Sequence, residues 1–278
     1  MGKNDVSAAF TSEFEDGVHI IYSGQGGSKL RNTVRTKTNV TGKDVTFQKK
    51  GKGSAGKKTR NGDVPLMNPD HTPATATLGD WYAAELVDKL DEFKIQHDER
   101  KTSQVIAASA LGGVIDGRII GQAALTTNVI GDGATGFSKL KLQQGNKILN
   151  GNSVPQDGNR YAIVGPNQWE ELMNIKEFAS SDYSKELFPW LQYAEGKSWN
   201  GYTWVMLPDL PLVDGVRSCF LYHKTAIGLA EACDVQCDID WVPLKAAHLV
   251  NSYISAGAVL IDGEGVVEIK CDDDAPLA

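Results

Sequence analysis

The chain has 278 residues, of which 41% are hydrophobic and 23% are charged, and its formal net charge is −7. This ordinary globular composition supports a sizeable core in one large domain or two smaller ones. It argues against long membrane spans, because no run approaches the roughly 18 consecutive apolar residues that a span requires. The polar N-terminus lacks the apolar region of a signal peptide, so we expect synthesis in the cytoplasm.

The first 29 residues are predicted to form an N-terminal arm. They are polar with scattered apolar positions and end in the run Ser23-Gly24-Gln25-Gly26-Gly27-Ser28. A phosphate-binding loop would continue into Gly-Lys-Ser/Thr, and that ending is missing. The run therefore indicates a flexible link.

The segment from Lys29 to Arg60 has the most informative charge pattern in the chain. Eleven Lys and Arg residues stand against one acid, Asp44, which gives a net charge of +10 and leaves −17 for the rest of the chain. Its apolar residues are too sparse to offset the entropy of ordering, so we expect the segment to project and to find order against an acidic partner. The remainder of the same protein is such a partner, and self-assembly becomes the first hypothesis.

A two-stranded excursion is predicted over residues 30–75. Threonine and valine alternate weakly from Leu30 to Phe47, which is typical of a strand, and Asn61-Gly62-Asp63 is a turn signal. We expect the basic tip of this extended loop to make contacts between subunits and not within one. The candidate contact residues are Lys49, Lys50, Lys52, Lys57, Lys58 and Arg60.

Two helices are predicted next. From Leu78 to Phe93 apolar residues recur at spacings of three to five, with Asp80 as a candidate N-cap. The longest helix signal covers residues 103–125, where alanine and glycine keep the helix thin enough for close approach by its neighbours. Residues 126–136 are rich in Gly, Asn and Asp and form a candidate domain boundary.

Residues 137–232 alternate helix and strand signals, which predicts a small α/β lobe. Helices are expected at 137–149 and from Pro166 to Met173, where proline fits the first turn. Strands are expected at 160–164, 202–207 and 218–222. Residues 235–270 are strand-like, with a turn at Gly263-Glu264-Gly265.

The sequence holds no recognisable catalytic chemistry. The five histidines are far apart, and none has the spacing of a metal ligand set. Cys233 and Cys237 are four apart, which fits neither a zinc knuckle nor a redox pair, and we expect all four cysteines to be buried free thiols. No nucleophile elbow, zinc-protease motif or dinucleotide fingerprint occurs. We expect no enzyme, no metal and no cofactor.

Several packing and turn sequences follow one another in a specific order. They are Val64-Pro65-Leu66-Met67-Asn68-Pro69-Asp70-His71, Ala110-Leu111-Gly112-Gly113-Val114-Ile115-Asp116, Gln156-Asp157-Gly158-Asn159-Arg160-Tyr161, Glu177-Phe178-Ala179-Ser180-Ser181-Asp182-Tyr183, Tyr222-His223-Lys224-Thr225-Ala226-Ile227-Gly228 and Ser255-Ala256-Gly257-Ala258. Together they resemble the major capsid proteins of tailed bacteriophages (Caudoviricetes) over most of residues 60–270. Where that family often has a bulkier residue or arginine after Ala-Leu-Gly, this chain has Gly113.

The resemblance implies an α+β tailed-phage major capsid fold with four parts. These are an N-terminal arm (1–29), an extended loop (30–75), a peripheral domain (76–136 and 233–278) with a spine helix at 103–125, and an axial α/β domain (137–232). It also implies a virion shell subunit, made in the host bacterial cytoplasm, that forms hexameric and pentameric capsomers around double-stranded DNA without sequence-specific contact. Scaffolding, portal and decoration proteins are further expected partners, with any scaffolding protein encoded separately because the arm is short.

Two other interpretations stay open. A sequence-blind nucleic-acid-binding protein would use the 29–60 segment for salt-sensitive phosphate contacts, although the segment has a single aromatic residue for stacking, Phe47. A cellular nanocompartment shell would use the same fold. Electron microscopy of the particles and their contents separates all three.

Overall fold

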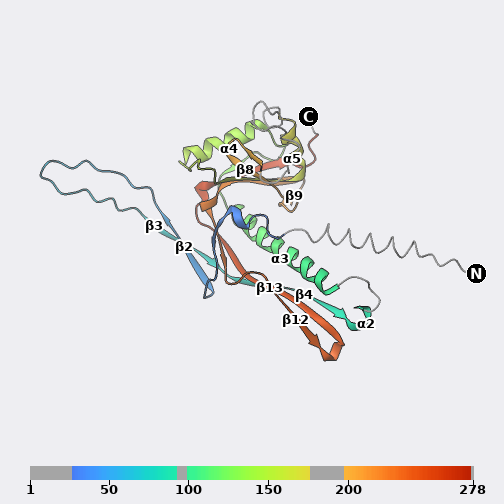
Figure 1. Cartoon of the computed structure of the whole chain (residues 1–278). Helices are drawn as coiled ribbons and strands as arrows, with labels where there is room; N and C mark the ends of the chain where they lie inside the picture. The colour runs from blue at the N-terminus through green and yellow to red at the C-terminus, as the bar shows by residue number, and fades with distance from the viewer. Residues whose placement is uncertain (1–26, 93–98, 176–196, 277–278) are drawn as a thin grey trace, which may run out of the picture.

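The computed structural model describes residues 27–92, 99–175 and 197–276. Within these ranges the chain forms two β-sheets, a long helix beside the first sheet, and a two-stranded hairpin that projects far from the body (Figure 1). A shared apolar core joins the two sheets and the long helix.

The first sheet is built around one long strand, β13 (Ala247–Leu260). Its hydrogen-bonded order is β1 (Arg35–Lys37), β11 (Ile227–Glu231), β13 and β12 (Gln236–Val242), and β4 (Gly79–Asp88) also pairs with β13. Helix α3 (Glu99–Ala123) packs against β13 and β4 (Figure 1). The short helix α2 (Lys89–Glu92) follows β4, and the turn η3 (Pro243–Lys245) joins β12 to β13.

The second sheet forms a lobe with two helices. Its order is β5 (Val129–Ile130), β14 (Val266–Asp272), β10 (Val216–His223), β6 (Arg160–Val164), β8 (Tyr202–Met206) and β7 (Lys197–Trp199), and β9 (Leu212–Val213) pairs with β10. Helices α4 (Lys139–Gly151) and α5 (Pro166–Met173) lie on this lobe (Figure 1). Ser138 caps α4, because its hydroxyl accepts the N–H of Lys141. Trp204 and Phe220 are fully buried in the lobe.

Most predicted elements of the lobe and the long helix are confirmed. The helix predicted from Pro166 to Met173 has the same bounds as α5, and α3 covers most of the predicted 103–125 helix. The turns η2 (Lys224–Ala226) and η4 (Gly263–Gly265) connect strands, the second where the Gly-Glu-Gly turn was expected.

The helix predicted from Leu78 is wrong, because residues 79–88 form strand β4. β13 offers this segment a continuous antiparallel partner, with Trp81 opposite Ile254 and Val87 opposite His248. Alternate side chains of β4 lie toward α3, where the guanidinium carbon of Arg118 is 4.6 Å from the centre of the Trp81 ring. The period is therefore two, not the helical spacing.

The projecting segment also begins later than predicted. Residues 30–43 lie on the body: η1 (Arg31–Thr33) and β1 precede the hairpin, and Leu30 and Val34 are fully buried. Arg31 forms ion pairs with the buried Glu231 and with Asp234, at 2.6 and 2.9 Å. The buried Leu30 and Val34 and the ion pairs of Arg31 with acids far along the chain hold this stretch on the body. Only six of the eleven cations stand on the hairpin.

The sheets do not follow the expected domain boundaries. Strand β14 lies within the expected peripheral range but pairs with β10 of the lobe, and β11 lies within the expected axial range but pairs with β13. Residues Thr102–Ala123 of α3 have the length and apolarity of a membrane-crossing helix, with a mean hydropathy of 1.2. Leu111, Ile115 and Ile119 of this helix nevertheless lie in the apolar core that joins the two sheets.

Candidate assembly surfaces

The hairpin is held to the body by a small apolar root. Strands β2 (Asp44–Lys50) and β3 (His71–Thr77) pair only with each other, from Asp44 opposite Thr77 to Lys50 opposite His71. Val45, Phe47 and Ala76 point inward and pack with Ala230 in a cluster separate from the main core. A Cβ on Gly228 would lie 3.0 Å from the Phe47 ring, so glycine there allows Phe47 to seat.

The six expected contact residues divide into two groups. Lys49 forms an ion pair with Asp262 at 2.7 Å, and the Lys52 ammonium donates to the Asn152 carbonyl at 2.8 Å. The expectation that the tip contacts nothing within its own subunit is therefore wrong for these two lysines, which lie at the hairpin base. The side chains of Lys50, Lys57, Lys58 and Arg60 are exposed, with no hydrogen bond or ion pair to another described residue.

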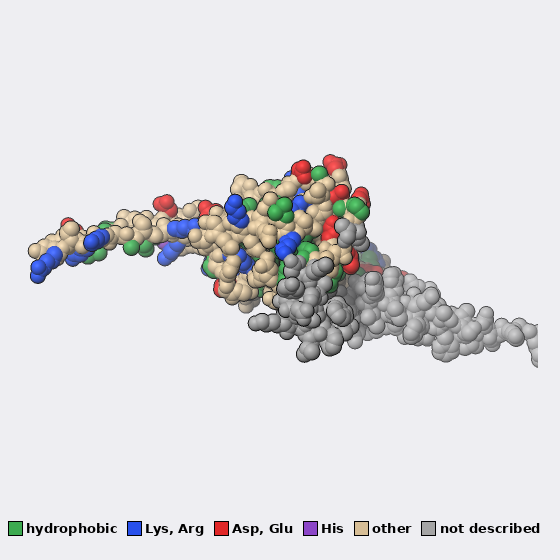
Figure 2. All heavy atoms as spheres, turned by 90° about the horizontal axis from the view of Figure 1, so that it is seen from above, with side chains coloured by type: hydrophobic (Ala, Val, Ile, Leu, Met, Phe, Trp, Pro, Cys, Tyr) green, Lys and Arg blue, Asp and Glu red, His purple; other side chains and the backbone are tan. Residues whose placement is uncertain are grey.

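Apolar residues on the returning limb of the hairpin are exposed too, and the charge pattern alone did not single them out. Val64, Leu66 and Met67 expose 67%, 83% and 57% of their surface. The facing limb is rich in glycine, and a Cβ at Gly53 or Gly56 would overlap Met67 or Pro65, so the two limbs run close together. The hairpin thus presents cations beside apolar side chains, and Figure 2 shows the blue cations spaced along it.

The first sheet has one face that α3 does not cover, which we call the outer face. Cross-strand partners share a face of a sheet, so the register places Tyr82, Leu86, Leu249 and Tyr253 there together with Asp80, Asp88, Asp238 and Asp240. No Lys or Arg occupies the outer-face positions of β4, β12 and β13. Tyr82 is 69% and Leu86 41% exposed. The outer face is therefore acidic, partly aromatic and uncovered within the described chain.

The start of the described chain is anchored on α3 by a buried carboxylate. Asp116 accepts the Ser28 hydroxyl and the backbone N–H groups of Lys29 and Leu30, the latter two at 3.0 Å. Burial raises the pKa of Asp116, while these hydrogen bonds act to lower it. Of the glycines predicted to let neighbours approach α3, Gly112 does so, because a Cβ there would overlap the backbone of residues 27 and 28.

The titratable groups form no arrangement typical of catalysis. Hydrogen bonds from Asn159 and His223 hold the pKa of Asp157 well below its usual range, while the other nitrogen of His223 contacts Thr225. No group of three His, Cys, Asp or Glu residues within the described ranges is placed to hold a metal ion. Cys219 and Cys271 are buried, whereas the other two cysteines are half-buried, and all four are free thiols.

Several solved capsid structures have the same fold as this chain. The capsid of an empty GTA particle matches with a TM-score of 0.67 and 13% identity, over 89% of this chain and 90% of that chain. The capsid of Ralstonia phage GP4 matches with a TM-score of 0.67 and 11% identity, over 88% of each chain. The capsid of cyanophage P-SCSP1u matches with a TM-score of 0.63 and 16% identity, over 86% of each. At these identities the matches establish the fold.

The family follows from the sequence. No curated protein matches the chain. The sequence model of the phage capsid protein family matches residues 6–273, which is nearly the whole chain. This protein therefore belongs to the phage capsid protein family, whose members are structural components of the virion shell.

Proposed function

We propose that this capsid protein is the major shell subunit of a tailed bacteriophage, and that it assembles into hexamers and pentamers around double-stranded DNA. Family membership and the shared fold support this, as does the similarity to a GTA capsid computed with C5 symmetry. The observation that carries the proposal is the projecting hairpin. A long basic hairpin that is held to its own subunit by a small apolar cluster is suited to contact with a neighbouring subunit.

The expected domain roles are retained with modified boundaries. The first sheet and α3 form the peripheral domain, and the second sheet with α4 and α5 forms the axial domain at the capsomer centre. Strand β14 then belongs to the axial domain and β11 to the peripheral domain, in keeping with their pairing. Residues 44–77 form the extended loop, and most of the expected N-terminal arm (1–29) lies outside the described residues.

We propose that the hairpin of one subunit lies on the outer face of the next. The hairpin carries six cations against three aspartates, whereas the outer face carries four aspartates and no cation. Each surface also exposes apolar side chains, including Leu66 on the arm and Tyr82 on the face. An exposed ion pair contributes only about 0–1 kcal/mol, so burial of these apolar groups at each repeated contact must contribute as well.

A nucleic-acid-binding role for the basic segment is less well supported. Single-stranded nucleic acids are bound by stacking bases on aromatic side chains, and Phe47, the segment's one aromatic residue, is fully buried at the hairpin root. The hairpin's own aspartates also reduce its attraction for phosphate. The nanocompartment alternative uses the same fold, and the contents of purified particles distinguish it.

Charge reversal at the hairpin tip tests the proposal. The variant Lys57→Glu/Lys58→Glu should leave the subunit folded but weaken shell formation, measured by sedimentation and electron microscopy, and high salt should mimic it in part by screening. The matched control is Lys43→Glu/Lys147→Glu, which makes the same change of charge at two exposed positions off the hairpin tip. The intersubunit role is wrong if the tip variant assembles as well as the parent, or if the control weakens assembly equally.

A further inference from the structure

The angle at which the hairpin leaves the body depends on few contacts. The apolar root ends at Phe47, which is fully buried, and the next residues toward the tip face an open cleft of about 360 Å³. Hairpin residues 49–52 line one side of this cleft, and residues 152–155, His223, Asp262 and Glu264 line the body side. Directly beyond its root, the hairpin is therefore separated from the body by an open cleft.

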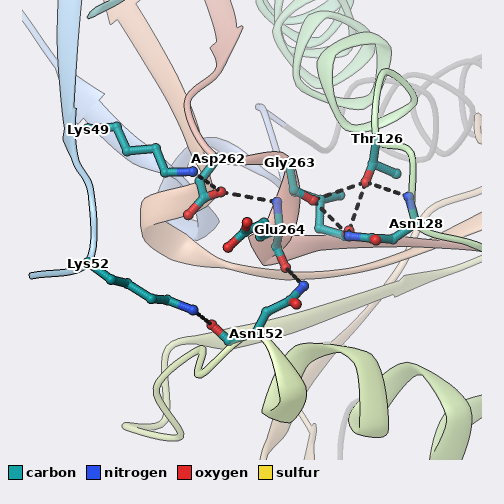
Figure 3. Close-up of polar contacts among 9 residues, drawn as sticks. Lys49, Lys52, Thr126, Asn128, Asn152, Asp262, Gly263 and Glu264 are labelled. Atoms are coloured by element: carbon teal, nitrogen blue, oxygen red, sulfur yellow. Dashed lines mark hydrogen bonds and ion pairs between the residues drawn. The ribbon is translucent and has the colours of Figure 1, made fainter. Parts of the chain in front are cut away.

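Two polar contacts cross the cleft from the hairpin (Figure 3). The Lys49 ammonium reaches the Asp262 carboxylate at 2.7 Å, and the Lys52 ammonium reaches the Asn152 carbonyl at 2.8 Å. Between the two lysines, the Gly51 N–H donates to the Asp70 carbonyl, a backbone bond that joins the two limbs to each other and not to the body. These two contacts therefore link the hairpin to the body beyond its apolar root.

On the body, the partners of these two lysines belong to a hydrogen-bond network that joins three parts of the fold. Asp262 also accepts the Glu264 N–H at 3.0 Å, and the Asn152 amide donates to the Glu264 carbonyl at 2.9 Å, which connects the turn after β13 to the end of α4. Thr126 and Asn128, just beyond α3, donate to the Gly263 carbonyl of the same turn at 3.1 and 2.9 Å (Figure 3).

We infer that the turn Asp262–Gly265 and Asn152, which is bonded to it, form a latch. Asp262 and Asn152 hold the hairpin at a fixed angle through Lys49 and Lys52, and the hairpin pivots about Phe47 when these two contacts break. Ion pairs that are about one-third exposed are weak in water, so a neighbouring subunit or a shift of α4 or α3 can open the latch. The hairpin from Phe47 to its turn spans roughly 40 Å at about 3.3 Å per residue, so a swing of about 10° moves the tip by about 7 Å.

The effect of the latch on assembly rests on the proposed function. If the hairpin bridges subunits, its angle sets the tilt of the next subunit, and so the curvature of the shell. The latch itself is a property of one subunit and can be tested without assembly.

The test measures the distance between the hairpin and the body in the full-length protein. Spin labels are attached at Asp63→Cys on the hairpin and Lys147→Cys on α4, in a background with Cys233→Ser and Cys237→Ser, and labelled protein is diluted with an excess of unlabelled protein. Lys49→Ala/Lys52→Ala should broaden and shift the distance distribution. The control Lys57→Ala/Lys58→Ala removes the same charge at exposed tip positions with no described contact, outside the cleft, and should leave the distribution unchanged.

Two further variants check the contact itself. Asp262→Asn keeps the oxygen that accepts the Glu264 N–H but removes the charge opposite Lys49, so it should broaden the distribution less than the double alanine variant. The charge swap Lys49→Asp/Asp262→Lys should give a narrower distribution than Asp262→Lys alone, because both variants lack the acceptor for the Glu264 N–H and only the swap restores the ion pair. An unchanged distribution in Lys49→Ala/Lys52→Ala overturns the latch, even if tip charge reversal still blocks assembly. A latch that behaves as expected in a protein whose tip variant assembles normally would instead overturn the proposed contact.

Discussion

Replacing Phe47 with alanine should release the hairpin while the main body stays folded. Phe47 is fully buried, yet it belongs to a small cluster with Val45, Ala76 and Ala230 that is separate from the core of the two sheets. The Lys37 ammonium also lies 4.7 Å from the centre of its ring. The cost of the substitution therefore falls on the attachment of the hairpin.

The expected magnitude follows from the burial. Truncating a buried phenylalanine to alanine costs about 3–5 kcal/mol, and loss of the cation–π contact adds about 0.5–1 kcal/mol. Because about 1.4 kcal/mol corresponds to a factor of ten, the root should open more often by on the order of 100-fold or more. The increase in opening has an upper limit, because it cannot exceed the increase that corresponds to the free energy holding the root closed in the parent protein.

Native-state hydrogen exchange measures this opening. Amides of β2 and β3 should exchange faster in Phe47→Ala, while those of β10 and β14 keep their protection. The control is Phe220→Ala, equally buried but in the main core, which should reduce protection in the second sheet and lower the melting temperature further. If Phe47→Ala leaves exchange in β2 and β3 unchanged, or lowers protection equally in the hairpin and in the second sheet, the hairpin root is not a separate unit.

Three further predictions follow from other contacts. Asp116→Ala leaves the N–H groups of Lys29 and Leu30 without their acceptor and should destabilise the subunit by about 1–3 kcal/mol; an unchanged melting temperature would contradict the anchor. The hydrogen bond from Arg217 lowers the pKa of Asp273, so the stability that this pair contributes is present above the unfolded pKa of about 3.9 and is lost as the pH falls through the lower folded value. Asp273→Asn should therefore flatten the acid limb of the melting curve against pH, and an unaltered limb would count against it. Because the thiols are free, assembled shells should run as monomers on denaturing gels without reductant; a reductant-sensitive ladder would overturn this.

Sequence reasoning succeeded where local signals decide the structure. Pro166 opens α5 at its first turn, and the wide apolar stripe of α3 is a helix signal long enough to outweigh its glycines. It failed where a distant partner decides. Strand β4 owes its conformation to β13, more than 150 residues away, and short-range spacing could not show that pairing.

The candidate site was predicted in part for the same reason. The six cations could be read from composition, and four of them do stand exposed on the hairpin without a described contact. Their neighbours Val64, Leu66 and Met67 were visible in the sequence, but their exposure depends on the hairpin standing clear of the body. The acidic outer face could not be predicted from the sequence, since Asp80 and Asp240 share one face of the sheet only because their strands pair with β13.

Cryo-electron microscopy of the assembled shell tests most directly whether the hairpin of one subunit lies on the outer face of its neighbour. We predict density for residues 44–77 across the outer face of an adjacent subunit, with Lys57, Lys58 and Arg60 near its aspartates and Leu66 against its Tyr82. A shell in which the hairpin turns toward the packaged DNA, or contacts only its own subunit, would contradict the account.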